Sequence, residues 1–147
     1  MTREQELLSA AALTVFRLNG RFLDLAEGLA RPAGLTAAWW QVLGAVLTEP
    51  QPVSAIARDM GLTRQAVQRT ADLLVDRSLL TYRDNPAHRR AKLVVPTAEG
   101  RTAVAAIAPE HQRAARRLVE TLGEDRLADA IAAMDSLAKA LDTLDHR

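Results

Sequence analysis

The chain has no cysteine, and this absence excludes disulfides, thiolate metal sites and redox sensing through a reactive thiol. Aromatic residues make up only 3% of its 147 residues, and most of its 48% hydrophobic content is Ala, Leu and Val. Ala and Leu lose little freedom in a helix, whereas strands prefer β-branched and aromatic side chains. The composition therefore predicts a mainly α protein. Its length fits one structural domain, because domains cluster around about 100 to 150 residues.

Long apolar runs are also absent. No stretch approaches the roughly 18 to 20 uninterrupted apolar residues that span a bilayer. A signal peptide would need an apolar run near the N-terminus, where this chain has Arg3, Glu4 and Glu6. We therefore expect a cytoplasmic protein without a membrane partner.

The net charge of +1 hides an uneven distribution of charge along the chain. Residues 53–101 contain nine Lys or Arg against five Asp or Glu, whereas the remainder contains ten against thirteen. A basic centre between acidic ends suggests an anion-binding face in the middle of the chain.

Two apolar seams lie at the ends of the chain. The first follows steps of three and four residues, as one face of a long helix requires; it consists of Leu8, Ala11, Val15, Leu18, Phe22, Leu25 and Leu29. The second follows Gly123 and consists of Leu127, Ile131, Met134, Leu137, Leu141 and Leu144. A monomer of this size cannot easily bury both seams, so we expect a homodimer in which the terminal helices pair.

Short elements are predicted between the seams. Residues 31–34, Arg-Pro-Ala-Gly, end the first helix, and a second helix is expected from Thr36, its cap, to about Thr48. Residues 53–60 predict a short helix that Gly61 closes, and Thr63 is placed to cap a helix from Arg64 to about Leu79. Two helices joined by such a turn form a helix-turn-helix.

A hairpin is expected after these helices. Residues 80–83 and 92–95 are rich in strand-forming side chains, and the polar residues 84–91 separate them. Thr97 then caps a further helix, which Pro109 should kink or restart because proline lacks the N–H and its ring clashes with the preceding turn.

The amino-acid sequence of residues 35–101 is similar to that of a known protein family. The segments that carry the resemblance are Leu35-Thr36, Val42-Leu43, Ser54-Ala55-Ile56-Ala57, Arg69, Leu74, Leu79-Leu80, Asn85-Pro86-Ala87-His88-Arg89-Arg90-Ala91 and Thr97-Ala98-Glu99-Gly100. Together they resemble the multiple-antibiotic-resistance regulator (MarR) family. The resemblance implies a winged helix-turn-helix with dimerisation helices at 1–34 and 98–147 around a DNA-binding region at 35–97.

Some family positions differ in this chain. Asn85 and His88 stand where the family usually has two wing aspartates, the second of which steadies the wing arginine, here Arg90. Ser78 replaces a usual glycine before the first strand, and Tyr82 followed by Arg83 replaces the usual strand arginine. These changes bear on the geometry of the wing.

The resemblance implies a DNA-binding transcriptional regulator, acting as a ligand-responsive repressor on a palindromic operator. We expect Arg64, Gln65 and Gln68 to read bases in the major groove, since Arg suits guanine and Gln suits adenine. Thr63 and Arg69 are expected on phosphates. On an isolated helix the same side chains would be ordinary solvated surface, and only the resemblance assigns them to DNA.

The hairpin tip is expected to contact the DNA backbone and the adjacent minor groove through Arg89, Arg90 and Lys92. His88 should add a pH-dependent contribution, because an unperturbed histidine titrates near pH 6.5. The alternative is that this basic tip serves only solubility.

Trp39 and Trp40 are adjacent, so a helix aims them about 100° apart. We expect one of these side chains to pack in the core. The other is expected to line a cleft between the dimerisation helices and the DNA-reading helix-turn-helix. Family members bind small aromatic or amphipathic effectors there; plain core or interface packing is the alternative.

Other classes of function fit less well. An enzyme would need a nucleophile, base and orienting group, or a metal, and the three histidines at 88, 111 and 146 lack the paired spacing of a metal site. We expect no catalytic residue, metal or cofactor. The alternative from another class is a winged-helix protein-interaction module that has lost sequence-specific DNA binding.

Overall fold

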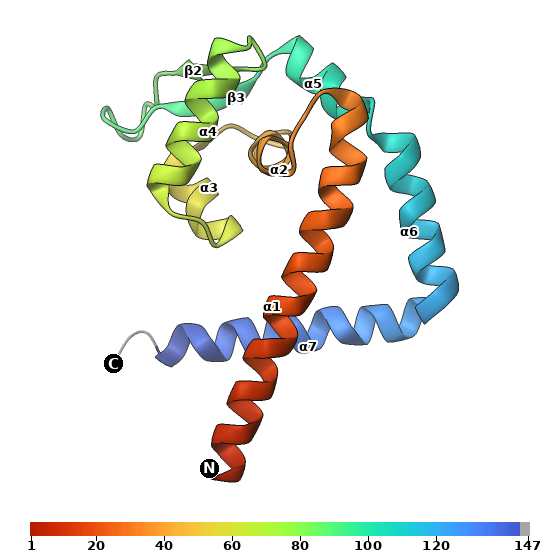
Figure 1. Cartoon of the computed structure of the whole chain (residues 1–147). Helices are drawn as coiled ribbons and strands as arrows, with labels where there is room; N and C mark the ends of the chain where they lie inside the picture. Colours follow the sequence, from red (N-terminus) through yellow and green to blue (C-terminus); the bar gives the residue numbers. More distant parts are fainter. Residues whose placement is uncertain (145–147) are drawn as a thin grey trace. The chain divides into compact units, whose positions relative to one another are not determined.

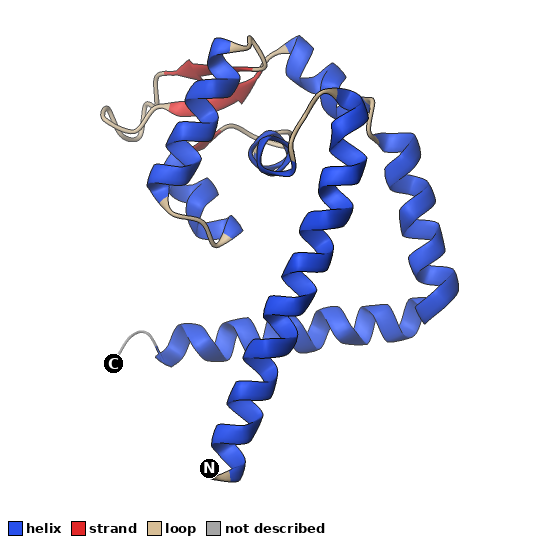
Figure 2. Cartoon of the chain, in the orientation of Figure 1, coloured by secondary structure: helices blue, strands red, loops and turns tan. Residues whose placement is uncertain are grey.

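The computed structural model describes residues 1–144 and divides the chain into two compact units, Met1–Ala108 and Pro109–Arg147. Most of the described residues are helical, and one small antiparallel sheet lies in the first unit (Figures 1 and 2). The mainly α fold with a hairpin wing is thereby confirmed. The division into regions 1–34, 35–97 and 98–147 stays a prediction.

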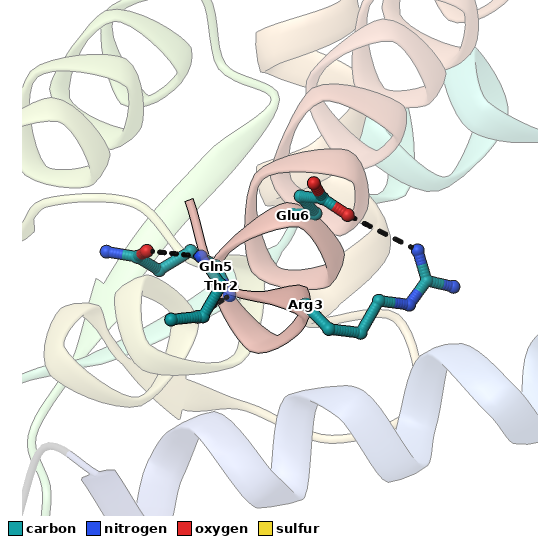
Figure 3. Close-up of polar contacts among 4 residues, drawn as sticks. All are labelled: Thr2, Arg3, Gln5 and Glu6. Carbon is teal, nitrogen blue, oxygen red and sulfur yellow. Dashed lines mark hydrogen bonds and ion pairs between the residues drawn. The ribbon is translucent and has the colours of Figure 1, made fainter.

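The first unit begins with the long helix α1 (Arg3–Ala30). A capping box starts it: Thr2 Oγ1 accepts a hydrogen bond from the Gln5 N–H at 3.2 Å, and Gln5 Oε1 accepts one from the Thr2 N–H at 2.8 Å (Figure 3). An ion pair of 3.6 Å joins Arg3 to Glu6 on the same turn. The caps satisfy N–H groups that a helix start leaves without partners.

Helix α2 (Ala37–Ala45) passes through the core of this unit, with Val42 and Leu43 fully buried. It begins where the sequence predicts, because Thr36 Oγ1 accepts from the Trp39 N–H at 3.1 Å. A short 3₁₀ turn, η1 (Arg31–Ala33), connects it to α1, and Glu27 of α1 accepts a hydrogen bond from the Ala37 N–H at 3.0 Å. The helix ends at Ala45, three residues before the predicted Thr48.

The helix-turn-helix consists of α3 (Val53–Met60) and α4 (Arg64–Asp76). Gly61 takes the left-handed conformation at φ 66°, which glycine adopts at little cost. Thr63 Oγ1 accepts from the Ala66 N–H at 3.0 Å and so caps α4. Val67, Ala71 and Leu74 are buried as predicted, and this fixes which face of α4 remains exposed.

Helix α4 ends at Asp76, so the prediction that it continues to about Leu79 is wrong. The Ser78 N–H donates to the Val75 carbonyl and the Leu79 N–H to the Leu74 carbonyl, the pattern of a Schellman motif. Ser78 occupies the left-handed position of this motif with φ 63°, and it is the only described residue other than glycine with a positive φ. The family glycine at this position thus has a conformational reason.

The sheet has the order β1-β3-β2, and both pairings are antiparallel. Strands β2 (Leu80–Arg83) and β3 (Leu93–Pro96) form the predicted hairpin, with Tyr82 opposite Val94. Strand β1 (Gln51–Pro52) pairs with β3 and was not expected from the sequence. Figure 1 shows α4 beside this hairpin, in agreement with the contacts between α4 and β2.

The turn after α4 is joined to the start of α5 (Ala98–Ala105). Thr97 Oγ1 donates to the Ser78 carbonyl at 2.6 Å and accepts from the Gly100 N–H at 3.0 Å. The Thr97 N–H donates to the Leu79 carbonyl at 3.1 Å. A Cβ at Gly100 would lie 2.1 Å from the Leu79 carbonyl oxygen, so only glycine fits there.

Two further helices follow, α6 (Ala108–Leu122) and α7 (Glu124–Leu144), with Gly123 between them at φ 94°. The predicted interruption at Pro109 takes the form of a restart, because α5 ends at Ala105 and Pro109 stands in the first turn of α6. Proline fits that position, where its missing N–H would have no helical partner. His146 lies outside the described residues.

Candidate nucleic-acid interface

A hollow of about 1020 Å³ lies where the start of α4 meets the wing loop, which we define as residues 84–91. Six of the predicted contact residues line it: Arg64, Gln65, Gln68, His88, Arg90 and Lys92. The start of α3 also contributes, through Val53 and Ser54. Among the described residues, no acidic one lines the hollow. The structure therefore brings together side chains that lie up to 40 positions apart in the sequence, from Pro52 to Lys92, and most of them are basic or amide-bearing.

On α4 the predicted base readers are exposed in the first two turns. Arg64 and Gln65 are exposed together with Gln68, because the buried Val67 turns the opposite face inward. Thr63 uses its oxygen as the helix cap, and its hydroxyl proton is still able to donate to a phosphate. Arg69 is exposed on α4 but does not line the hollow.

The wing loop is shaped by hydrogen bonds of its own backbone. Asn85 Oδ1 accepts from the Ala87 N–H at 3.0 Å, and the Asn85 carbonyl accepts from the His88 N–H at 3.1 Å. The His88 carbonyl in turn accepts from the Ala91 N–H at 3.2 Å. Two consecutive turns thus present His88 and Arg90 to the hollow, while Arg89 is exposed elsewhere on the loop. The side chain of Asn85 forms the turn and also lines the hollow, a role that we did not predict for it.

The cations of this surface are not engaged by the protein. Within residues 1–144, the ion pairs are those of Arg3, Arg58, Arg113 and Lys139. None of the predicted contact residues takes part in them. The charges of Arg64, Arg69, Arg89, Arg90 and Lys92 are therefore available to an external anion.

One polar cluster at the hollow was missed by sequence reasoning. Gln68 Nε2 donates to Asp72 Oδ1 and to Tyr82 Oη, both at 3.0 Å, and the Tyr82 hydroxyl donates to the same Asp72 oxygen. Burial, the hydrogen bond to Asp72 and the negative charge of that carboxylate raise the pKa of Tyr82 well above its ordinary value, and the hydrogen bond from Gln68 opposes them. Spacing on α4 could have paired Gln68 with Asp72, but nothing local indicates Tyr82.

Trp39 and Trp40 lie on α2, away from the hollow. Both are partly buried against the same core cluster, so the expectation that only one of them packs there is wrong. A helix aims adjacent side chains apart, but α2 is covered on several sides, and both rings find core neighbours. The Arg77 guanidinium lies 4.9 Å from the centroid of the Trp39 ring, within the range of a cation–π contact. Their predicted part in an effector cleft stays a prediction.

The described part of the chain contains no group of three or more His, Cys, Asp or Glu that could hold a metal ion. None of the helices within residues 1–144 has both the length and the apolar composition that crossing a membrane requires.

The sequence model of the MarR family matches residues 33–91, which include α2, the helix-turn-helix and the wing loop. The chain belongs to the MarR family. The match contains all the predicted contact residues except Lys92, which follows it directly.

Relatives and solved structures extend the similarity beyond the matched segment. An uncharacterized protein of Mycobacterium tuberculosis is 38% identical over 136 residues, which cover 88% of this chain and 89% of that protein. The M. tuberculosis regulator MOSR, solved in complex with DNA, has a TM-score of 0.72 at 23% identity over 89% of this chain and 97% of that one. CouR from Rhodococcus jostii RHA1, solved with p-coumaroyl-CoA, has a TM-score of 0.75 at 24% identity over 87% and 91%.

The fold of this MarR-family chain is therefore that of the winged-helix transcription regulators. The family and these solved neighbours are transcription regulators rather than enzymes.

Proposed function

We propose that this MarR-family protein is a dimeric transcriptional regulator that inserts α4 into the major groove of duplex DNA and places the wing loop on the adjacent backbone and minor groove. The observation that carries the proposal is the hollow itself, where Arg64, Arg90 and Lys92 gather without an acidic lining residue or an internal ion pair. The major groove is about 12 Å wide and admits one helix. The complex of MOSR with DNA supports the same use of the fold.

The roles within this surface follow from chemistry. Arg64 and Gln65 carry sequence readout from the first turn of α4, and Gln68 follows one turn later. Thr63 and Arg69 hold phosphates beside the groove. His88, Arg89, Arg90 and Lys92 hold the backbone and reach the minor groove, whose negative potential attracts arginine.

Dimerisation is proposed from the exposed apolar seams. On α1 the exposed fraction is 60% for Leu8, 40% for Val15 and 50% for Phe22. On α7 it is 56% for Ile131 and 59% for Leu144. Contiguous apolar faces of this kind mark association surfaces, and two copies can bury them together.

Repression and ligand control complete the proposal. A dimer that covers a promoter blocks transcription. Its two α4 helices must lie about 34 Å apart to enter successive major grooves. An effector that favours a different distance between them therefore releases the dimer from DNA and ends repression. CouR with p-coumaroyl-CoA supports a small aromatic or amphipathic effector, for which Trp39 and Trp40 are the proposed contacts. A regulator of genomic DNA acts in the cytoplasm.

Selection of binding sites from a pool of random duplexes tests this proposal. A two-fold dimer should enrich a palindrome whose half-sites lie about 10 base pairs apart, centre to centre. Arg64→Ala should reduce the enrichment at fixed positions of each half-site. A pool in which no sequence is enriched would contradict sequence-specific binding and favour a winged-helix protein-interaction module.

A further inference from the structure

The side chains of the wing loop make no hydrogen bond outside the loop within residues 1–144. The hydrogen bonds of the loop join Asn85 to Ala87 and His88, and His88 to Ala91, so they give the loop its internal shape. They do not fix where the loop lies relative to α4. That position depends on how the hairpin of β2 and β3 is held against α4.

Tyr82 is the last inward-facing residue of β2 before the wing loop. Side chains alternate along a strand, so Tyr82 shares its face with the buried Leu80. Opposite Tyr82 lies Val94 of β3, which is also buried. The ring of Tyr82 packs against this core, and its hydroxyl reaches α4 and donates to Asp72 Oδ1. This hydrogen bond therefore joins α4 to the end of β2 from which the wing loop leaves.

The bond between Tyr82 and Asp72 belongs to a strong class, because hydrogen bonds to an ionised carboxylate are about twice as strong as neutral ones. Tyr82 keeps its proton at neutral pH, since burial and the hydrogen bond to Asp72 raise its pKa above the ordinary value. Gln68 Nε2 lies 3.0 Å from both oxygens. The two oxygens are bonded to each other, so they lie on one side of the amide and share a single N–H. The second N–H and the carbonyl of Gln68 stay available to a base.

We propose that Asp72 and Tyr82 are positioning residues for the wing, whose hydrogen bond holds the end of β2 against α4 and so places the wing cations for DNA before binding. This inference rests on the proposed function. Within the described residues, the hydrogen bonds between the hairpin and side chains of α4 are those of Tyr82. A wing without them must be ordered when DNA binds, and that ordering lowers the affinity.

Tyr82→Phe isolates the bond, because it keeps the ring and removes only the hydroxyl. It should weaken DNA binding by about threefold to tenfold for each half-site, the effect of one hydrogen bond, and so by about tenfold to a hundredfold for a dimer. Fluorescence anisotropy on the duplex that the wild-type protein selects measures the loss. Thermal melts establish that each variant is folded at the temperature of the assay.

Double-mutant cycles show through which contacts the hydroxyl acts. One background lacks the wing cations through three substitutions, Arg89→Ala, Arg90→Ala and Lys92→Ala. In this background the wing gains little from its position, so Tyr82→Phe should weaken binding less than twofold. In a Gln68→Ala background the loss should keep its full size, because Tyr82 still bonds Asp72 there. One low salt concentration serves for all proteins, since low salt strengthens the weakest complexes.

Variants of Asp72 separate the hydrogen bond from the charge. Asp72→Ala removes the acceptor and should weaken binding as much as Tyr82→Phe does. Asp72→Asn should recover most of the lost affinity, because its amide oxygen still accepts from the Tyr82 hydroxyl. Asp76→Ala is the matched control, since Asp76 is exposed one turn further along α4 and its loss removes the same charge but leaves Tyr82 bonded. Its affinity should not fall.

The outcomes separate the two proposals. If the wild-type protein selects no duplex, the proposed function fails and the inference fails with it. If it selects one but Tyr82→Phe leaves the affinity unchanged, or if Asp72→Asn binds as weakly as Asp72→Ala, the inference is wrong while the function stands. A loss that persists without the wing cations, or that disappears in the Gln68→Ala background, would show that the hydroxyl acts on the fold or on Gln68 and would also overturn the inference.

Discussion

Replacing Gly100 with alanine should destabilise the first unit through one close backbone contact. The added Cβ would lie 2.1 Å from the Leu79 carbonyl oxygen and 3.3 Å from Leu43 Cδ2, whereas ordinary van der Waals contact begins near 3.4 Å. The Leu79 carbonyl would have to move by about 1 Å, and it accepts the hydrogen bond from the Thr97 N–H. Overpacking costs about 1–3 kcal/mol and the broken hydrogen bond about 1 kcal/mol.

Alanine gives back about 1 kcal/mol through its higher helix propensity, so the net loss should be about 2 kcal/mol. In a protein of this size that corresponds to a fall in Tm of about 4–8 °C. Thermal melts followed by circular dichroism at one fixed protein concentration measure it, since a dimer melts in a concentration-dependent way. Gly44→Ala is the control, because its added Cβ would meet no atom within 4 Å beyond its chain neighbours and the nearby backbone of α2, and α2 should gain stability. If Gly100→Ala melts at or above the wild-type temperature, the end of α4 is not packed on α5 as described.

Three further predictions concern the turn and the wing loop. Ser78→Gly should raise the free energy of unfolding by about 0.5–1 kcal/mol, because relief of the left-handed conformation exceeds the entropy that glycine adds to the unfolded chain; urea melts that show a decrease would contradict this. Arg90→Ala should reduce the slope of log affinity against log salt concentration by about 1.8 for a dimer, because each phosphate that is no longer neutralised accounts for about 0.9. Arg58→Ala is the control: Arg58 is paired with Asp59, so its loss should leave the slope unchanged. His88→Ala should weaken DNA binding modestly, because the His88 side chain lines the hollow together with Arg90 and Lys92. Fluorescence anisotropy at one fixed pH measures this loss, and an unchanged affinity would remove His88 from the DNA contacts.

Much of the fold could be predicted because its signals are local. The caps Thr36, Thr63 and Thr97 each act on an N–H three residues ahead, and Gly61 takes the left-handed turn that ends α3. Such signals depend only on neighbouring residues, so they can be read from the sequence. The hairpin could likewise be predicted from the strand-forming side chains of residues 80–83 and 92–95 and from the polar residues between them.

What could not be predicted depends on partners distant in sequence. Strand β1 is two residues long and contains Pro52, so only its pairing with β3 makes it a strand. The end of α4 was misplaced because Ser78 takes a conformation that favours glycine. The hydrogen bond from Gln68 to Tyr82 joins residues 14 positions apart on different elements, so no local pattern in the sequence indicates it.

The most direct test of the account is binding of the purified protein to a duplex of its own upstream region against a scrambled duplex of the same composition, over a series of salt concentrations. The account predicts tight, salt-dependent binding that prefers the native duplex, a loss of that preference in Arg64→Ala, and a loss of affinity for both duplexes in Arg90→Ala. Equal, weak binding to both duplexes that neither substitution changes would contradict the assignment of α4 and the wing loop to DNA.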